Sequence, residues 1–146
     1  HPDAIEWTLL AQHIKELRDQ KTIRQPIYSY LKCLRNEETI KTNPSPVVIV
    51  EGILVLGHKH LRDLMDLKIF VSADADDRLA RVIQRDIIER GRSVSTVLER
   101  YDKTVKPSHL QFIEPTKRYA DVIVPQGGSN NVAIDLLSKY IMQNLT

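Results

Sequence analysis

The chain has 146 residues, of which 42% are hydrophobic and 27% charged, a composition that fits about one folded domain. Its formal net charge of +2 is too small for general nucleic-acid binding, and a single cysteine excludes an internal disulfide or a cysteine zinc cluster. The longest apolar run, residues 47–56, contains Glu51 and is too short to span a membrane. Without a signal peptide, we expect a cytoplasmic protein.

The first third of the chain predicts a helix followed by a hairpin. Apolar residues recur at helical spacing over residues 3–19, and Asp3 is placed to cap that helix. Residues 26–31 alternate weakly between apolar and polar, and residues 39–42 are a possible antiparallel partner. The prolines of residues 43–46 then break regular structure.

Three short apolar runs further along predict parallel strands, at residues 47–50, 67–71 and 121–124. Helical patterns cover residues 59–65, 78–90, 94–119 with interruptions at two prolines (Pro107 and Pro115), and 130–144. Strands that alternate with helices predict an α/β fold with a parallel sheet, and the first run is apolar on both faces, as a central strand should be. Ligands of such sheets bind at the carboxyl ends of strands, which here indicates Glu51 and residues 72–74.

An arginine-rich segment is the most informative part of the sequence. Its apolar residues form a stripe that should face the core: Leu79, Val82, Ile83 and Ile87. Its arginines are Arg78, Arg81 and Arg85 on the opposite face, with Arg90 and Arg92 on either side of the helix break at Gly91. Guanidinium groups that converge at a helix end suit a polyphosphate, because the planar fork binds phosphate in two places. The alternative is a solvated basic face, paired with Asp74, Asp77 and Glu89.

Several other side chains are candidates with ordinary alternatives. Glu51 could hold the magnesium of a nucleotide, often through water, or could cap a helix or pair with an arginine. Asp3 could bind a sugar hydroxyl or act only as a helix cap, and Tyr28 could stack on a base or only pack. Cys33 has no obvious partner base, so it is either inert or part of a pocket lining.

Two features that phosphoryl transfer needs are absent from the sequence. No segment matches the phosphate loop G-x-x-x-x-G-K-[ST], and no residue is a clear general base. The chain starts at His1 rather than at methionine, so we expect the first residue to be an internal position of a longer protein.

Many short motifs nevertheless occur in a characteristic order over nearly the whole chain. They include Pro26-Ile27-Tyr28-Ser29-Tyr30, Val48-Ile49-Val50-Glu51-Gly52, Glu89-Arg90-Gly91-Arg92 and Tyr119-Ala120-Asp121-Val122. Together they resemble the uridine/cytidine kinase family of P-loop kinases, in its bacterial form. The resemblance implies an α/β fold with a parallel sheet flanked by helices and a small β-hairpin lobe that binds the nucleoside.

The same resemblance implies a domain organisation. Residues 1–146 would form a single domain, the carboxy-terminal two-thirds of such a kinase, with a hairpin substrate lobe at residues 25–42 and an arginine-rich lid at residues 78–100. The first strand, the phosphate loop and the catalytic base would lie upstream of His1. We therefore expect the 146-residue piece to be inactive by itself, since positioning and electrostatics supply most of this catalysis.

The implied activity is transfer of a phosphate from ATP or GTP to the 5′-hydroxyl of uridine or cytidine, giving UMP or CMP in pyrimidine salvage, with Mg²⁺ and in a homotetramer. By position, Glu51 would help hold magnesium, and Arg85 and Arg90 would bind the ATP phosphates. Arg92 would lie near the nucleoside and the transferring phosphate, as the catalytic candidate of this chain, and Tyr28 would pack against the pyrimidine. Asp3 follows the expected position of the ribose-binding aspartate.

Three departures from the family pattern fall on substrate contacts. Cys33 replaces a base-reading histidine, Val82 replaces one of two paired lid arginines, and Arg100 replaces a glutamine that contacts substrate. They leave open an alternative, a non-catalytic relative that binds a nucleotide or a partner. A related kinase that acts on another acceptor, such as a sugar phosphate, is a third possibility.

Overall fold

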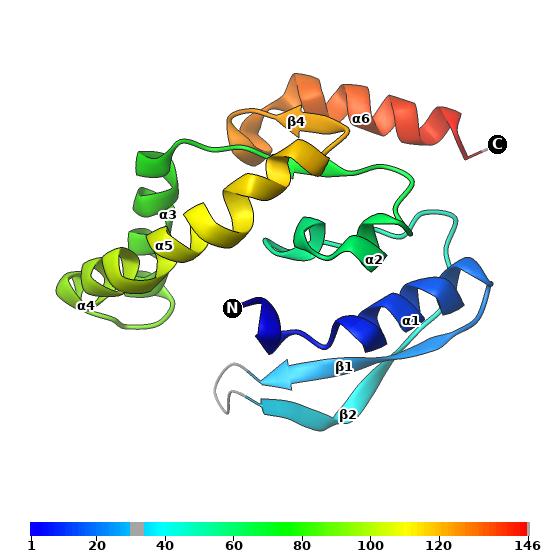
Figure 1. Ribbon diagram of the computed structural model, residues 1–146, viewed down its shortest axis with the longest axis horizontal. Coiled ribbons are helices and arrows are strands. Elements are labelled where there is room, and N and C mark those ends of the chain that lie inside the picture. Colours follow the sequence, from blue (N-terminus) through cyan, green and yellow to red (C-terminus); the bar gives the residue numbers. More distant parts are fainter. Residues whose placement is uncertain (30–33, 146) are drawn as a thin grey trace.

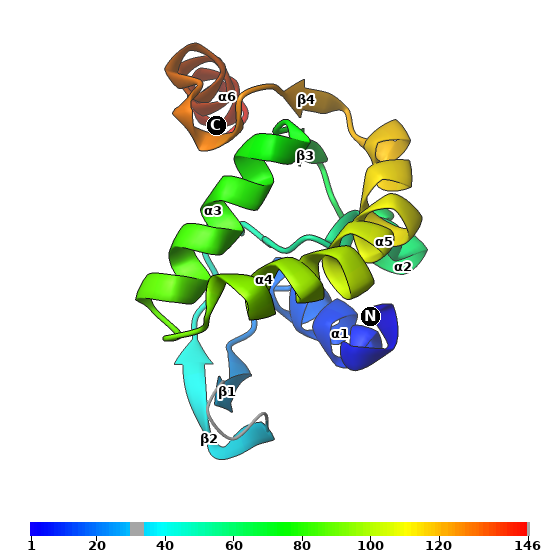
Figure 2. The same cartoon turned by 90° about the vertical axis from the view of Figure 1, so that its left-hand side faces the viewer.

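The computed structural model describes residues 1–29 and 34–145 and has a mixed α/β architecture. Figure 1 shows the β-hairpin beneath α1 at one end of the molecule and α6 at the opposite end, and Figure 2 agrees. The elements in chain order are η1 (Pro2–Ala4), α1 (Trp7–Arg18), β1 (Ile23–Ser29), β2 (Leu34–Thr42), η2 (Val55–Gly57), α2 (Lys59–Arg62), β3 (Ile69–Val71), α3 (Ala75–Ile88), α4 (Val94–Arg100), η3 (Tyr101–Val105), α5 (Lys106–Ser108), η4 (His109–Ile113), η5 (Glu114–Tyr119), β4 (Val122–Val124), η6 (Gly127–Ser129) and α6 (Asn131–Gln143).

The first helix starts later than the sequence pattern predicts. Asp3 lies in the separate 3-10 turn η1, and Ile5 is extended with φ −109° and ψ 133°, which separates that turn from α1. Glu6 is the N-cap residue of α1, so the prediction that Asp3 caps this helix is wrong. The indole Nε1 of Trp7 donates a hydrogen bond of 3.0 Å to the carbonyl oxygen of Pro2, which holds the turn against the helix start.

The predicted hairpin is present and is longer than expected. β1 pairs antiparallel with β2, with Pro26 opposite Thr39 and Tyr28 opposite Arg35. The register shifts between Pro26 and Tyr28, as it does at a β-bulge, where one strand carries an extra residue. Ile23 at the start of β1 is buried, whereas most of β2 is exposed.

Two of the three predicted parallel strands form. β3 pairs parallel with β4, with Phe70 opposite Ile123. An ion pair closes the start of both strands, because Lys68 Nζ lies 2.9 Å from the Asp121 carboxylate. The backbone N–H of Lys68 donates to the same carboxylate at 2.7 Å. Hydrogen bonds from the side chain and backbone of Lys68 lower the pKa of Asp121 below its ordinary value.

The prediction of a central strand at residues 47–50 is wrong for this structure. The segment pairs with no strand that the structure describes, and Val48 and Ile49 are 42% and 81% exposed. A strand forms only when its backbone N–H and C=O groups pair with a neighbour. Among the described residues, β3 and β4 pair only with each other, so the apolar run has no partner.

Residues 94–119 are helical, and Pro107 does not interrupt them as predicted. Pro107 lies inside α5, between the π-helical segments η3 and η4, and Pro115 lies in the first turn of the 3-10 segment η5. Proline removes one backbone N–H from a helix, and the wider π turns on either side accommodate that loss.

α4 is anchored by Val97, which is 1% exposed, and its N-terminus is capped by Ser93, which accepts from the N–H of Thr96 at 3.2 Å.

The last helix, α6, is capped by Asn130. The side chain of Asn130 accepts a hydrogen bond of 3.0 Å from the N–H of Ala133. No residue of α6 is fully buried, and Val132, Leu136 and Tyr140 are exposed along one stripe. Within the described part of the chain, no helix combines the length and the apolar composition that crossing a membrane requires.

Candidate functional site

Four arginine side chains surround one buried carboxylate, that of Asp86 on α3. Its Oδ1 atom accepts from Arg85 Nε at 3.0 Å and lies 2.9 Å from Arg85 Nη2 and 3.2 Å from Arg90 Nη1. Its Oδ2 atom lies 2.7 Å from Arg92 Nη1 and 4.0 Å from Arg100 Nη1. We call these five residues the Asp86 cluster.

The turn between α3 and α4 brings the cluster together. Gly91 has φ 61°, in the left-handed region that glycine adopts without strain, and it reverses the chain after α3. The backbone N–H of Arg92 then bonds the carbonyl oxygen of Asp86 at 3.1 Å, which places the Arg92 side chain beside the carboxylate. Figure 2 shows α3 and α4 meeting at this corner, and Arg100 returns to it from the last turn of α4.

The cluster carries an excess of positive charge. Asp86 is only 2% exposed, and burial alone would raise the pKa of its carboxyl group. Hydrogen bonds from Arg85 and Arg92, with the charges of Arg85 and Arg90, outweigh burial and lower this pKa below its ordinary value of 3.8. Asp86 is therefore ionised at neutral pH, and one negative charge faces four positive ones.

The guanidinium groups of the cluster also reach solvent. Their side chains are between 34% and 50% exposed. Each guanidinium has five N–H donors, and the contacts with Asp86 occupy only one or two nitrogens of each. Donors therefore remain for an anionic ligand, and the planar fork suits phosphate oxygens.

The structure does not gather all the arginines of the segment that the sequence singled out. Arg78 Nη1 donates to the carbonyl oxygen of Ala73 at 3.2 Å. The Arg81 guanidinium lies against Gly127, where an added Cβ atom would be 2.9 Å from Nη1. These two side chains thus lie at the carboxyl ends of β3 and β4, while Arg85, Arg90 and Arg92 share the Asp86 cluster.

The alternative pairing of these arginines with other acids is wrong. Asp74, Asp77 and Glu89 form no ion pair with any residue that the structure describes. The apolar stripe of α3 is also different from the prediction, because Asp86 is buried and Ile87 is 36% exposed.

Glu51 lies in the unpaired stretch that follows residues 47–50 and is exposed. In residues 1–29 and 34–145, no three His, Cys, Asp or Glu side chains gather as a metal site. A single carboxylate fits Mg²⁺ that is held mainly by phosphate oxygens and water. The role of Glu51 in holding magnesium remains a prediction.

The hairpin places Tyr28 on its surface, 49% exposed. Arg35, its cross-strand neighbour, forms an ion pair with Glu6, which ties the hairpin to the start of α1. Asp3 is exposed, and its backbone N–H donates to His1 Nδ1 at 3.3 Å. Cys33 lies outside the described residues. Within the described part, no ion pair joins Asp3 or Glu51 to the Asp86 cluster.

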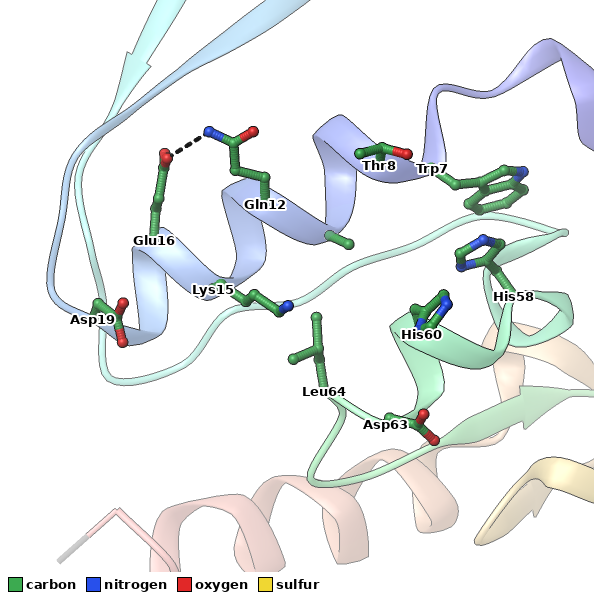
Figure 3. Close-up of a pocket in the computed structure, with 11 residues that line it drawn as sticks. Trp7, Thr8, Gln12, Lys15, Glu16, Asp19, His58, His60, Asp63 and Leu64 are labelled. Atoms are coloured by element: carbon green, nitrogen blue, oxygen red, sulfur yellow. Dashed lines mark hydrogen bonds between the residues drawn. The ribbon is translucent and has the colours of Figure 1, made fainter.

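A cavity of about 600 Å³ lies between α1 and α2 (Figure 3). The rings of Trp7 and His58 stack beside it, with centroids 4.9 Å apart and planes 9° from parallel. Lys15, His60 and Leu64 also line it. None of the site residues proposed from the sequence lines this cavity, so it adds no support to their roles.

Asp86 is the residue of this site that the sequence argument missed. A signal was present, because Asp86 follows Val82 and Ile83 at helical spacing and so continues the apolar stripe of α3. An acid on a buried face needs cations or hydrogen-bond donors to stay ionised. Arginines at positions 85, 90 and 92 are candidates for that task.

Comparison with known proteins identifies the family. The family model described as "Phosphoribulokinase / Uridine kinase family" matches residues 1–133. A protein named uridine kinase from Ligilactobacillus salivarius (strain UCC118) is 58% identical to this chain, over 94% of this chain and 64% of that protein. A protein of the same name from Lactobacillus johnsonii (strain CNCM I-12250 / La1 / NCC 533) is 51% identical, over 100% of this chain and 69% of that protein. Another from Bacillus subtilis (strain 168) is 54% identical, over 94% of this chain and 65% of that protein.

The chain thus spans about two thirds of the length of these relatives. The family model, over residues 1–133, covers the hairpin, the α3–α4 corner and the paired strands. The chain belongs to the phosphoribulokinase/uridine kinase family.

Proposed function

We propose that this chain forms the nucleoside lobe and the lid of a uridine/cytidine kinase. The enzyme would transfer the γ-phosphate of ATP or GTP to the 5′-hydroxyl of uridine or cytidine, giving UMP or CMP. The observation that carries the proposal is the Asp86 cluster, a group of partly exposed guanidiniums with excess positive charge. The names of the relatives support a nucleoside as the acceptor.

The arginines have separate tasks in this proposal. Arg85 and Arg90 bind the donor phosphates, and Arg92 faces the phosphoryl group that is transferred. Charge on the oxygens of that group is stabilised by guanidinium donors placed in advance, which is the main source of catalysis in phosphoryl transfer. The solvent-exposed donors of the cluster support these assignments.

The substrate side is proposed from the hairpin and its surroundings. Tyr28 packs on the pyrimidine, which its exposed aromatic ring on β1 supports. Arg100, at the edge of the Asp86 cluster, extends the positive charge toward the acceptor. Asp3 and Cys33 are the remaining proposed contacts to the nucleoside, at the ribose and the base respectively.

Glu51 is the proposed protein ligand for magnesium. A bound Mg²⁺ would bridge phosphate oxygens and offset their charge. An exposed carboxylate without an ion pair in the described part of the chain supports this role, because it remains available to bind the ion directly or through water.

The proposed activity needs parts that the 146 residues do not contain. The sequence has no phosphate loop of the form G-x-x-x-x-G-K-[ST] and no clear general base, and the relatives are longer. We therefore propose that both come from sequence outside these residues and that this chain alone has no kinase activity. The unpaired apolar stretch at residues 47–50 supports a neighbouring strand from the same source.

A substrate panel tests this proposal. The longer protein that we propose contains this chain is called the whole protein. With MgATP, it is given uridine, cytidine or a sugar phosphate in separate reactions, and the products are separated by chromatography. We expect UMP or CMP from the nucleosides, and no product when the 146-residue chain replaces the whole protein. Nucleotide binding without turnover on any acceptor would favour a non-catalytic relative. Turnover only on the sugar phosphate would move the protein to another branch of the family.

The assembly and location belong to the same proposal. The whole enzyme would be a cytoplasmic homotetramer in pyrimidine salvage, as the family resemblance implies. The exposed stripe of Val132, Leu136 and Tyr140 on α6 supports an apolar contact with another chain. Sedimentation equilibrium of the whole protein gives the subunit number, and a monomer over the micromolar range would contradict this part.

A further inference from the structure

We propose that Asp86 is a positioning residue, which holds Arg85, Arg90 and Arg92 in the arrangement that binds the donor phosphates. This inference rests on the proposed function, because it assigns to the lid arginines the task described above. Asp86 itself is 2% exposed and does not touch the ligand in this proposal, so it acts only through its neighbours.

The two oxygens of the Asp86 carboxylate contact different arginines. Oδ1 contacts Arg85 and Arg90, whereas Oδ2 contacts Arg92. Each oxygen therefore holds different guanidinium groups, and one carboxylate ties all three together. Most of their N–H donors are left for another anion.

The positive charges of the arginines in the Asp86 cluster repel one another. Four guanidinium groups lie within 4.0 Å of one carboxylate, and its negative charge offsets the repulsion between them. Among the described residues, Asp86 is the only acid that forms an ion pair with these arginines. Without it, the side chains would spread into solvent, and each would have to be ordered again when a polyphosphate binds. Ordering long side chains on binding reduces affinity.

A purely structural role is the alternative, because Asp86 also joins α3 to the segment before α4. The corner has other supports, however. Val97 is 1% exposed beneath α4, Ser93 caps that helix, and the Asp86 carbonyl oxygen bonds the N–H of Arg92 through backbone atoms alone. A variant that changes only the carboxylate keeps these supports.

The decisive variant is Asp86→Asn, which keeps the shape and removes the charge. Glu89→Gln is the matched control, because Glu89 is a nearby, exposed acid at the end of the same helix and forms no ion pair within the described residues. Both variants are made in the whole protein, and KM for MgATP, KM for uridine, kcat and the melting temperature are measured.

We expect Asp86→Asn to raise KM for MgATP by about tenfold or more, since two or three arginines lose their positions. KM for uridine should stay within about twofold of the wild-type value, and Glu89→Gln should change neither constant by more than about twofold. A merely structural role predicts equal losses on both substrates, whatever the melting temperature of the variant. That result, or an unchanged KM for MgATP, overturns the proposal.

A measurement on the wild-type protein covers the case in which Asp86→Asn does not fold. Arginine Nε–H relaxation by NMR should show Arg85 as rigid as the backbone, because its Nε donates to Asp86, whereas Arg24 on the exposed surface of β1 should be mobile. Equal mobility of the two overturns the proposal.

Inorganic tripolyphosphate separates this proposal from the proposed function. It should bind the wild-type protein and shift the Arg85 and Arg92 signals, and should bind Asp86→Asn at least several-fold more weakly. If no nucleoside is phosphorylated by the wild-type protein, the proposed function fails, while rigidity and tripolyphosphate binding still decide the role of Asp86. Equal tripolyphosphate affinity of both proteins overturns that role.

Discussion

Asp86 remains charged inside the protein because guanidinium groups replace the water that it loses. Burial of a lone carboxylate is unfavourable, and a single partner leaves most of its lone pairs unsatisfied. Here both oxygens are contacted by arginines that are themselves partly in water, so these arginines keep much of their own hydration. The same arrangement that stabilises the acid leaves cations at the surface.

The lowered pKa of Asp86 predicts a pH-dependent contribution to stability. A carboxyl group whose pKa is lower in the folded than in the unfolded state stabilises the fold above its ordinary pKa of 3.8, and that contribution is lost as the pH falls through the lowered folded value. At pH 7 we expect wild type to exceed Asp86→Asn by roughly 1–3 kcal/mol in free energy of unfolding. Urea unfolding from pH 7 down to pH 2.5 should show the two proteins converging. A difference independent of pH would contradict the assignment.

Gly127 predicts a second effect at the residue scale. Its φ is +65°, and a Cβ atom would lie 2.9 Å from Arg81 Nη1, so Gly127→Ala introduces backbone strain, while the contact can be relieved by movement of the flexible Arg81 side chain. We expect a loss of about 1–2 kcal/mol in stability. Gly128→Ala is the control, since an added Cβ has nothing within 4 Å there. Thermal unfolding of both variants is the measurement, and equal melting temperatures would contradict the account.

Among single residues, the candidate arginines were easier to predict from the sequence than Asp86, the acid that they contact. Arg90 and Arg92 stand beside a glycine that ends a helix, which is a local pattern. The contact of Arg100 with Asp86 joins residues 14 positions apart, and it depends on the turn between α3 and α4, which the spacing of apolar residues does not predict. Asp86 was missed because the side chains that keep it charged are arranged by the α3–α4 corner.

At the scale of elements, the predicted α6 and hairpin form, whereas the predicted strand at residues 47–50 does not. α6 and the hairpin carry their own periodicity, and both form near the predicted positions, the hairpin with longer strands than expected. The stretch at residues 47–50 is just as apolar as β3, yet it remains unpaired, because a strand depends on a neighbour that the segment itself does not encode. The long helix through Pro107 survives for a related reason, since the surrounding π turns absorb the lost hydrogen bond.

α4 predicts a third effect, which links packing to the arginine site. Val97 is 1% exposed, so Val97→Ala removes buried methyl groups beneath the helix that carries Arg100. We expect a loss of about 2 kcal/mol in the free energy of unfolding. Val94→Ala, on the same helix but 50% exposed, is the control and should change stability by less than about 0.5 kcal/mol. Similar losses from both variants would mean that α4 does not pack as described.

At the scale of the whole structure, the 146 residues expose more surface than is expected for a folded protein of the same mass. Its accessible surface is 10833 Å², whereas a folded monomer of 16.8 kDa is expected to expose about 7,700 Å². Large apolar side chains contribute to the excess, among them Ile49, Ile53, Val132, Leu136 and Met142. A surface of this kind is typical of a part that packs against further sequence or other subunits.

The exposed, unpaired stretch at residues 47–50 predicts different rates of amide exchange in the 146-residue chain and in the whole protein. Their amide protons should exchange rapidly in the 146-residue chain, where the segment is unpaired, and slowly in the whole protein, where we propose a neighbouring strand. Hydrogen exchange with mass spectrometry compares the two. The amides of β3 provide the control, because they pair with β4 within the chain. Rapid exchange of residues 47–50 in both contexts would contradict the proposed strand.

The most direct test of the central claim is UMP formation from uridine and MgATP by the whole protein, as wild type and as Arg92→Gln. Arg92 contacts the Asp86 carboxylate through Nη1, and we propose that its other N–H donors face the transferring phosphate. Arg18→Gln is the control, because Arg18 lies on α1 and bonds Leu64 and Asp66. We predict that wild type forms UMP, that Arg92→Gln lowers kcat by about 100-fold or more, and that Arg18→Gln changes it little. Wild-type protein without activity, or Arg92→Gln with wild-type kcat, would contradict the account.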